Sequence, residues 1–105
     1  MNKNNLASRI SQLAQQIVQT YTPSKIILFG SATGRTLDIN DVDLLIIKED
    51  VPHTGTERIR QLYRMIDTDL PVDYLVYRPE ELENRIRLGD PFIRSILHEG
   101  KVLYG

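Results

Sequence analysis

The sequence predicts a small domain of the α/β or α+β class, in which helices pack on a mixed β-sheet of about three strands. Segments with apolar residues at helical spacing alternate along the chain with short apolar segments typical of strands. The 105 residues leave room for one domain with a modest core. We therefore expect residues 1–105 to form a single domain, and the 41% hydrophobic and 26% charged contents are typical of a folded protein.

The composition also excludes several classes of protein and site. The net charge of −1 gives no overall basic field, so we expect no direct binding of nucleic acid. The chain has no cysteine, which excludes disulfides and thiolate metal sites. The polar start Met1–Asn5 is unlike a signal peptide, and no apolar run approaches the ~20 residues of a transmembrane helix. We expect a cytoplasmic protein without membrane attachment.

The first predicted elements are a helix and a strand. Apolar residues recur at helical spacing from about Asn4 to Thr20 and predict an amphipathic helix, with Leu6, Ile10, Leu13, Ala14, Ile17 and Tyr21 as its stripe. The segment Thr22-Pro23-Ser24 ends this helix. Lys25 to Phe29 shows no alternation, which predicts a strand buried on both faces.

The next segment predicts a turn into a second strand. Gly30 breaks the first strand, and Ser31 is suited to cap a short helix that runs to about Arg35. A polar loop over 36–40 leads to a second strand from about Asp43 to Lys48. The connection is short, and this favours antiparallel pairing of the two strands because a parallel pair needs a longer crossover.

The following helix is predicted from a cap and a stripe. Thr54 and Glu57 have capping-box spacing, and apolar residues then predict a helix from about Thr56 to Thr68. Its other face carries three arginines, which we expect to face solvent, with docking of an acidic partner as the alternative: Arg58, Arg60 and Arg64.

Prolines mark the elements of the last third of the chain. Pro71 introduces a third strand, Val72–Tyr77. Pro79 is suited to the first position of a helix, and Asp90-Pro91 repeats this signal before a helix that ends at Gly100. The closing residues 102–104 are predicted as a short strand or an extended tail.

Two carboxylates at the start of the second strand suggest a metal site. Asp41 and Asp43 are one residue apart, so on a strand they share one face. Two neighbouring carboxylates repel each other, and a cation between them removes that cost. Oxygen ligands suit Mg²⁺, and Gly30-Ser31 at the preceding strand end allows a phosphate to approach the backbone. The stretch therefore predicts a metal–triphosphate site.

A third carboxylate commonly helps to hold two metal ions for phosphoryl transfer. Asp73 is the best candidate, because it lies within an apolar strand where a charge is costly without a partner. The alternative is that Asp73 simply faces solvent at a strand start. Of the other candidates, Asp38 is interpreted as a loop residue, and Asp67 and Asp69 as solvated turn residues. Asp50 is less favoured than Asp73 as a third metal ligand.

Taken together, these motifs resemble the minimal nucleotidyltransferase family of the polymerase-β superfold. They are Phe29-Gly30-Ser31, Gly34-Arg35 and Asp41-Val42-Asp43-Leu44-Leu45-Ile46, with Asp73 on a later strand. The resemblance extends over nearly the whole chain, to the closing segment 99–104. Small prokaryotic members of this family are typically encoded beside HEPN-domain proteins, as the antitoxin half of a toxin–antitoxin pair.

The resemblance implies a role for each matching residue. Asp41 and Asp43 would bind Mg²⁺, expected as two ions, and Asp73 would be the third ligand and a possible base. Gly30 and Ser31 would contact the phosphates of ATP. Arg35 is placed to reach a terminal phosphate, and an ordinary surface arginine is an equally good interpretation.

The sequence departs from the family pattern in two ways. The spacer between Ser31 and Asp41 has nine residues, one fewer than in many members, and Asn40 stands where a serine often precedes the first aspartate. The shorter loop leaves the placement of the triphosphate open.

The resemblance implies transfer of AMP from ATP to a hydroxyl of a HEPN toxin, with tyrosine as the expected acceptor. Because the core uses up the chain, the acceptor is expected on another molecule. Two alternatives remain: a non-catalytic antitoxin that blocks its partner sterically, and a small-molecule transferase completed by a dimer.

Overall fold

The computed structural model describes residues 3–30 and 41–105 and confirms the expected mixture of helices packed on a mixed sheet. The short helix predicted over 31–35 lies outside the described residues. The elements, in chain order, are α1 (Lys3–Tyr21), β1 (Lys25–Phe29), β2 (Val42–Ile47), α2 (Gly55–Met65), β3 (Val72–Tyr77), α3 (Pro79–Arg87), α4 (Pro91–Glu99) and β4 (Lys101–Tyr104).

The sheet of the described residues has four strands in the order β3-β2-β1-β4, one more than predicted. The extra strand is β4, because the end of the chain pairs antiparallel with β1, with Lys101 beside Leu28. β1 and β2 are antiparallel, as their short connection predicted. β2 and β3 are parallel, since α2 carries the chain back to the same end of the sheet.

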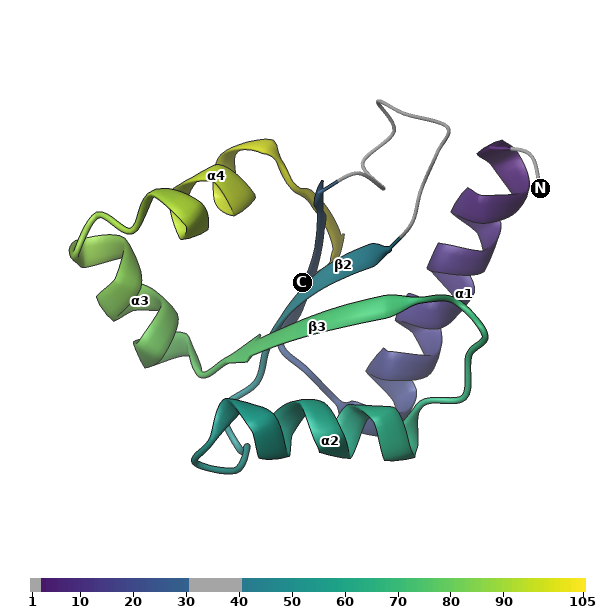
Figure 1. Ribbon diagram of the computed structural model, residues 1–105, viewed down its shortest axis with the longest axis horizontal. Coiled ribbons are helices and arrows are strands. Elements are labelled where there is room, and N and C mark those ends of the chain that lie inside the picture. The colour runs from purple at the N-terminus through teal and green to yellow at the C-terminus, as the bar shows by residue number, and fades with distance from the viewer. Residues whose placement is uncertain (1–2, 31–40) are drawn as a thin grey trace.

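Each face of the sheet has its own core. Figure 1 shows α1 and α2 on one side and α3 and α4 on the other. Alternate residues of β2 belong to opposite cores: Leu44 and Ile46 pack with the α1–α2 side, and Leu45 and Ile47 with the α3–α4 side. In β1, Ile26 and Leu28 belong to the first core and Ile27 to the second, which confirms the prediction that this strand is buried on both faces.

Two of the predicted helix starts, those of α2 and α4, have side-chain caps. The Thr54 hydroxyl accepts a hydrogen bond from the backbone N–H of Glu57, and the Asp90 carboxylate accepts from the N–H groups of Phe92 and Ile93. Helix α2 ends at Met65, earlier than the predicted Thr68. None of the described helices is long and apolar enough to cross a membrane.

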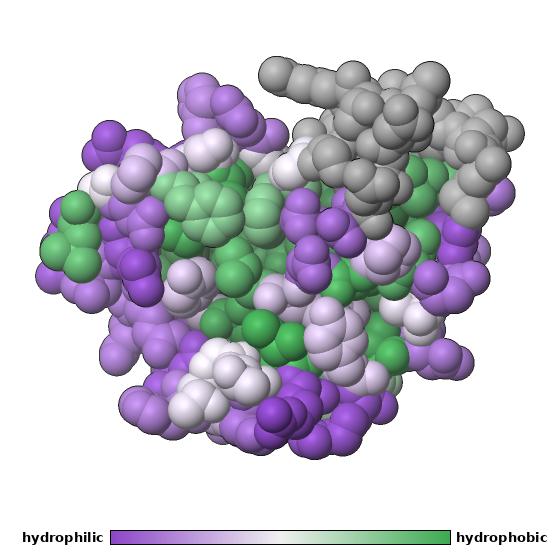
Figure 2. All heavy atoms as spheres, viewed as in Figure 1, coloured by the Kyte–Doolittle hydropathy of each residue, from purple (hydrophilic) through white to green (hydrophobic). Residues whose placement is uncertain are grey.

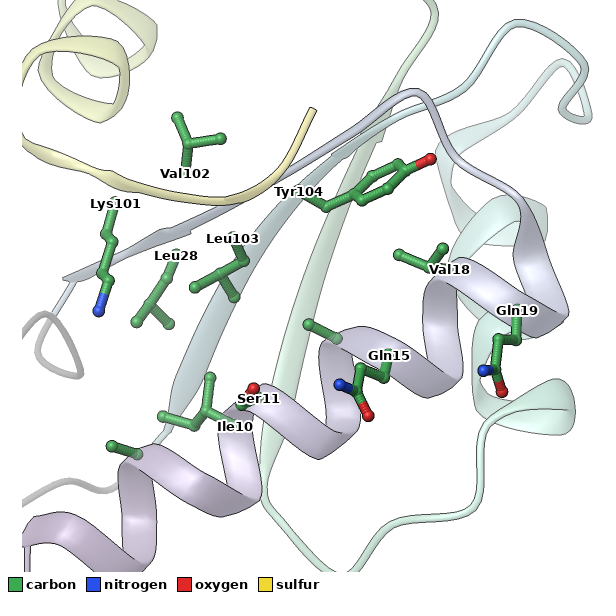
Figure 3. Close-up of a pocket in the computed structure, with 12 residues that line it drawn as sticks. Ile10, Ser11, Gln15, Val18, Gln19, Leu28, Lys101, Val102, Leu103 and Tyr104 are labelled. Carbon is green, nitrogen blue, oxygen red and sulfur yellow. The ribbon is translucent and has the colours of Figure 1, made fainter.

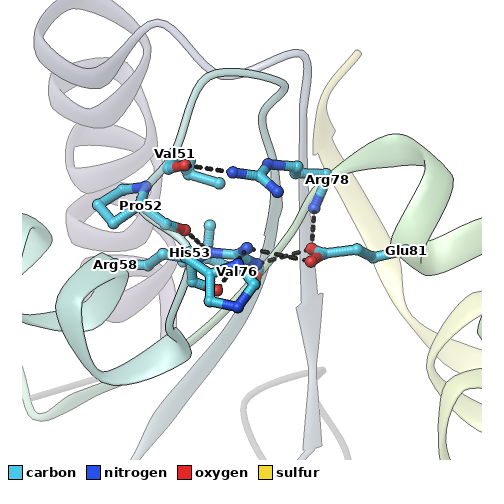
Figure 4. Close-up of polar contacts among 7 residues, drawn as sticks. All are labelled: Val51, Pro52, His53, Arg58, Val76, Arg78 and Glu81. Carbon is cyan, nitrogen blue, oxygen red and sulfur yellow. Dashed lines mark hydrogen bonds and ion pairs between the residues drawn. The ribbon is translucent and has the colours of Figure 1, made fainter.

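The expectation for Arg58 is wrong, because its side chain is buried instead of facing solvent. Its guanidinium makes a two-pronged ion pair with Glu81 of α3, with N–O distances of 2.7 and 3.0 Å (Figure 4). The remaining N–H groups donate to the carbonyls of Pro52, His53 and Val76. All five N–H groups of an arginine are thereby used. Arg58 joins the loop before α2, the end of β3 and the start of α3.

Candidate functional site

The predicted carboxylates meet at one end of the sheet. The parallel register of β2 and β3 places Asp43 directly beside Asp73. Asp41 lies just before β2, two residues from Asp43. Asp43 is half-buried, whereas Asp41 and Asp73 are exposed. Asp73 thus faces solvent, which was the alternative to a role as third metal ligand, and it also lies beside Asp43. We refer to these three residues as the carboxylate cluster.

The charges of the carboxylate cluster act on one another. The pKa of Asp43 is raised above its ordinary value, first by burial and then by the negative charges of Asp73 and Asp41. An ionised Asp43 is therefore costly in the protein without a counterion. A bound cation would offset both the burial and the repulsion.

Gly30 lies against this cluster from the neighbouring strand. Phe29, the last residue of β1, is the cross-strand partner of Asp43. Gly30 follows with a positive φ of +75°, and a Cβ added there would run into the Asp43 carboxylate. Only glycine allows this close approach of backbone to carboxylate. The fold thus brings together Gly30 and the carboxylates, while the predicted phosphate-binding residues Ser31 and Arg35 lie outside the described residues.

The donor set fits Mg²⁺ in its chemistry. The ion takes one or two protein carboxylates and keeps other positions for water and phosphate. The adjacent pair Asp43 and Asp73, with Asp41 beside it, offers such oxygen ligands. Within residues 3–30 and 41–105, however, no group of three or more acidic, histidine or cysteine side chains is arranged to hold a metal ion. The cluster is thus a set of neighbouring ligands that is not preformed as a three-ligand site.

Aromatic residues lie near the cluster, and two of them, Phe92 and Tyr63, are not among the site residues predicted from the sequence. Phe29 meets Phe92 of α4 edge to face, with ring centroids 5.9 Å apart. Tyr63 of α2 donates a hydrogen bond to the Val72 carbonyl at 2.8 Å. Burial and then the charges of Asp73 and Asp41 raise the pKa of Tyr63. The sequence places Tyr63 only within the apolar stripe of α2, because its nearness to the carboxylates depends on how β2 pairs with β3.

The sheet face next to the cluster offers apolar surface. In the space-filling view of Figure 2, hydrophobic residues (green) are exposed between the α3–α4 pair and α2, with hydrophilic residues (purple) around them. Leu75 and Tyr77 follow Asp73 at alternate positions of β3 and lie on this α3–α4 side. A molecule bound at the carboxylates can therefore also contact apolar side chains.

A separate hollow of the described structure lies away from the carboxylate cluster. It has a volume of about 640 Å³ and runs between α1 and β4 (Figure 3). Its lining includes Ala14, Val18 and Leu103 but no carboxylate, and Lys101 is its one charged residue. These side chains could not hold a divalent cation, so the carboxylate cluster is the better candidate for a metal site.

The other acidic residues lie apart from the cluster. Asp67 and Asp69 are exposed in the turn between α2 and β3, as predicted, and Asp69 makes an ion pair with Arg9. Asp50 is exposed in the loop after β2. Asp38 lies outside the described residues. Asp73 is therefore the described candidate that joins Asp41 and Asp43.

Comparison with known proteins does not assign the chain to a family. No family model matches it, and no curated protein or solved structure matches it significantly. The function is therefore argued from the carboxylate cluster, from Gly30 and from the resemblance of the motifs that contain them.

Proposed function

We propose that this protein is an Mg²⁺-dependent nucleotidyltransferase that acts as the antitoxin of a HEPN-domain toxin. It would transfer AMP from ATP to a hydroxyl of that partner, with tyrosine as the expected acceptor. The observation that carries the proposal is the juxtaposition of Asp43 with Asp73 and with the backbone of Gly30, beside Asp41. The cytoplasmic location expected from the sequence remains a prediction.

The residues divide the work of the reaction between them. Asp41, Asp43 and Asp73 would hold Mg²⁺, which neutralises phosphate charge and orients the reacting oxygens. Gly30 gives a phosphate access to the backbone beside Asp43, and Ser31 and Arg35 keep their expected phosphate contacts. Positioning and electrostatics would be the main contributions of the protein.

The transfer exchanges one phosphorus–oxygen bond for another. The acceptor hydroxyl oxygen forms a bond to the α-phosphorus of ATP, and the bond from that phosphorus to the bridging oxygen of pyrophosphate breaks. Pyrophosphate leaves with the bonding electron pair. The hydroxyl proton passes to a carboxylate, for which Asp73 is the proposed base because it is exposed at the edge of the cluster.

The test is incubation of the protein with ATP, Mg²⁺ and its co-expressed neighbour, the proposed partner, followed by intact mass measurement of both chains. We expect the partner to gain one or more AMP units. Asp43→Asn and Asp73→Asn should abolish the gain. Asp67→Asn is the matched control, because Asp67 is an exposed aspartate away from the cluster.

A non-catalytic binding antitoxin is the second candidate. It is favoured by the finding that the described residues form no preformed three-ligand metal group. In that case the same incubation would leave both masses unchanged, while a tight complex would still suppress the RNase activity of the partner. The Asp43→Asn variant would then suppress the RNase activity of the partner to the same extent as the unchanged protein.

A further inference from the structure

A small hollow adjoins the carboxylate cluster at the end of β1. It has a volume of about 180 Å³ and lies between β1 and α4. Its lining includes Gly30, whose backbone lies so close to the Asp43 carboxylate that a Cβ added there would clash with it. Pockets that bury a drug-sized ligand measure about 300–1,000 Å³. This hollow is therefore suited to part of a nucleotide, such as one ring system, rather than to the whole molecule.

One stripe of α4 forms the wall of the hollow opposite β1. Phe92, Ser95, Ile96 and Glu99 follow one another at helical spacing and all line it. At a rise of about 1.5 Å per residue, the stripe extends about 10 Å from Phe92 to Glu99. The stripe is aromatic at one end and acidic at the other. Ile93 and Ile96 are buried, so α4 holds both ends in place.

Phe92 presents an aromatic ring to solvent. The residue is 53% exposed although the neighbouring Ile93 is fully buried. Its contact with Phe29, at an interplanar angle of 81°, fixes the orientation of the ring and leaves much of its surface uncovered. Nucleobases stack on such rings with little regard to sequence, because every base has a π-face.

Glu99 supplies hydrogen-bond acceptors at the other end of the stripe. Its side chain is exposed, and the Ser95 hydroxyl donates to it at 3.5 Å. An ionised carboxylate accepts hydrogen bonds and repels phosphate. Glu99 therefore favours the part of a nucleotide that carries N–H or O–H donors, namely the amino group of the base and the ribose hydroxyls.

We propose that this hollow binds the nucleoside end of the substrate nucleotide, with the base stacked on Phe92 and Glu99 accepting a hydrogen bond from the nucleoside. The inference rests on the proposed function, because Gly30 then joins the nucleoside at α4 to the phosphates at the carboxylate cluster. Phe92 and Glu99 are specificity-determining residues in this proposal, and the sequence motifs included neither of them among the site residues.

The first test compares two ligands by isothermal titration calorimetry with Mg²⁺ present: ATP, and tripolyphosphate, which lacks the nucleoside. We expect ATP to bind more tightly than tripolyphosphate. Phe92→Leu keeps an apolar side chain and should weaken the binding of ATP about 10-fold, which corresponds to a loss of about 1.4 kcal/mol of stacking. Tripolyphosphate should bind this variant unchanged, and Phe92→Tyr should retain ATP binding. Leu88→Ala is the control, because Leu88 is 75% exposed and does not line the hollow.

The second test examines the Glu99 contact with nucleotides that lack one donor. Purine riboside triphosphate lacks the amino group, and 2′-deoxyATP lacks a ribose hydroxyl. We expect one of them to bind the unchanged protein about 10-fold more weakly than ATP, as the loss of a hydrogen bond to a charged group predicts. In Glu99→Ala this difference should disappear. The readout is a ratio of affinities, so a general change of charge at the site does not affect it.

The outcomes separate the inference from the proposed function. If ATP and tripolyphosphate bind equally, or if Phe92→Leu binds ATP as the unchanged protein does, the hollow does not hold the base and the inference is overturned. The proposed nucleotide site then still stands. If the unchanged protein binds ATP, purine riboside triphosphate and 2′-deoxyATP with equal affinity, the role proposed for Glu99 is overturned. If neither ATP nor tripolyphosphate binds the unchanged protein, the proposed function fails, and the inference fails with it.

Discussion

The ion pair between Arg58 and Glu81 supports one end of the sheet and offers a sharp test of the structure. Glu81 accepts two hydrogen bonds from the buried guanidinium and a third, at 2.8 Å, from the backbone N–H of Arg78. Glu81→Gln keeps the size of the side chain and removes its charge. The variant leaves the Arg58 charge, with a side chain only 4% exposed, without its counterion.

The magnitude follows from the protonation equilibrium of Glu81. The hydrogen bonds from Arg58 are the main cause that lowers the pKa of Glu81 from 4.5 to about 2. Since each factor of ten in the protonation equilibrium corresponds to 1.36 kcal/mol, the lowered pKa corresponds to at most about 3 kcal/mol. The Glu81 side chain is 35% exposed, so solvent screening reduces the contribution. We expect Glu81→Gln to lower the free energy of unfolding by about 2 kcal/mol at pH 7.

The sign of the pH dependence is fixed by the lowered pKa. The carboxylate stabilises the fold fully above pH 4.5, and this stabilisation is lost as the pH falls toward 2. Urea unfolding at pH 7 and at pH 3 measures it, with Glu83→Gln as the control because Glu83 is exposed on the same helix. If the two variants are equally stable at pH 7, or if the deficit of Glu81→Gln does not shrink at pH 3, the reasoning is wrong.

Three other predictions concern the cluster and the core. Gly30→Ala should destabilise the protein by about 1–3 kcal/mol, because the backbone has a positive φ there and the new Cβ would clash with the Asp43 carboxylate. Gly55→Ala is the control and should not destabilise the protein, because a Cβ at Gly55 meets open space. Urea unfolding compares the two variants. Asp43→Asn should stabilise the metal-free protein by roughly 0.2–1 kcal/mol at pH 7.5, because it removes a charge that is partly buried and repelled by Asp73. The gain should be smaller at lower pH, because the raised pKa of Asp43 means that its ionisation destabilises the fold. Equal effects at pH 7.5 and 4 would contradict this. Tyr21→Phe should stabilise the protein by about 1 kcal/mol, because the Tyr21 hydroxyl is buried and has no hydrogen-bond partner in the described structure. Thermal unfolding measures the change, and a loss of stability would refute this prediction.

The sequence determined the elements and much of the candidate site. The bounds of β1 and β3 are as predicted, because apolar strand segments and prolines mark them locally. The caps at Thr54 and Asp90 are likewise local, since each cap is formed with a residue two or three positions further along the chain. Asp41, Asp43 and Gly30 were also identified from the sequence, because the chemistry of carboxylates and of a backbone without a Cβ is visible in single residues.

Only the tertiary structure decided which distant residues meet. The register of β2 and β3 places Asp73 beside Asp43, and no spacing along the chain specifies a register between strands separated by a helix. The same holds for β4, whose pairing with β1 adds the fourth strand. Arg58 resembles a solvated residue by its helical position, yet the packing of α3 across the end of the sheet buries it. Local patterns record propensity and polarity, whereas burial and pairing depend on which surfaces the folded chain brings into contact.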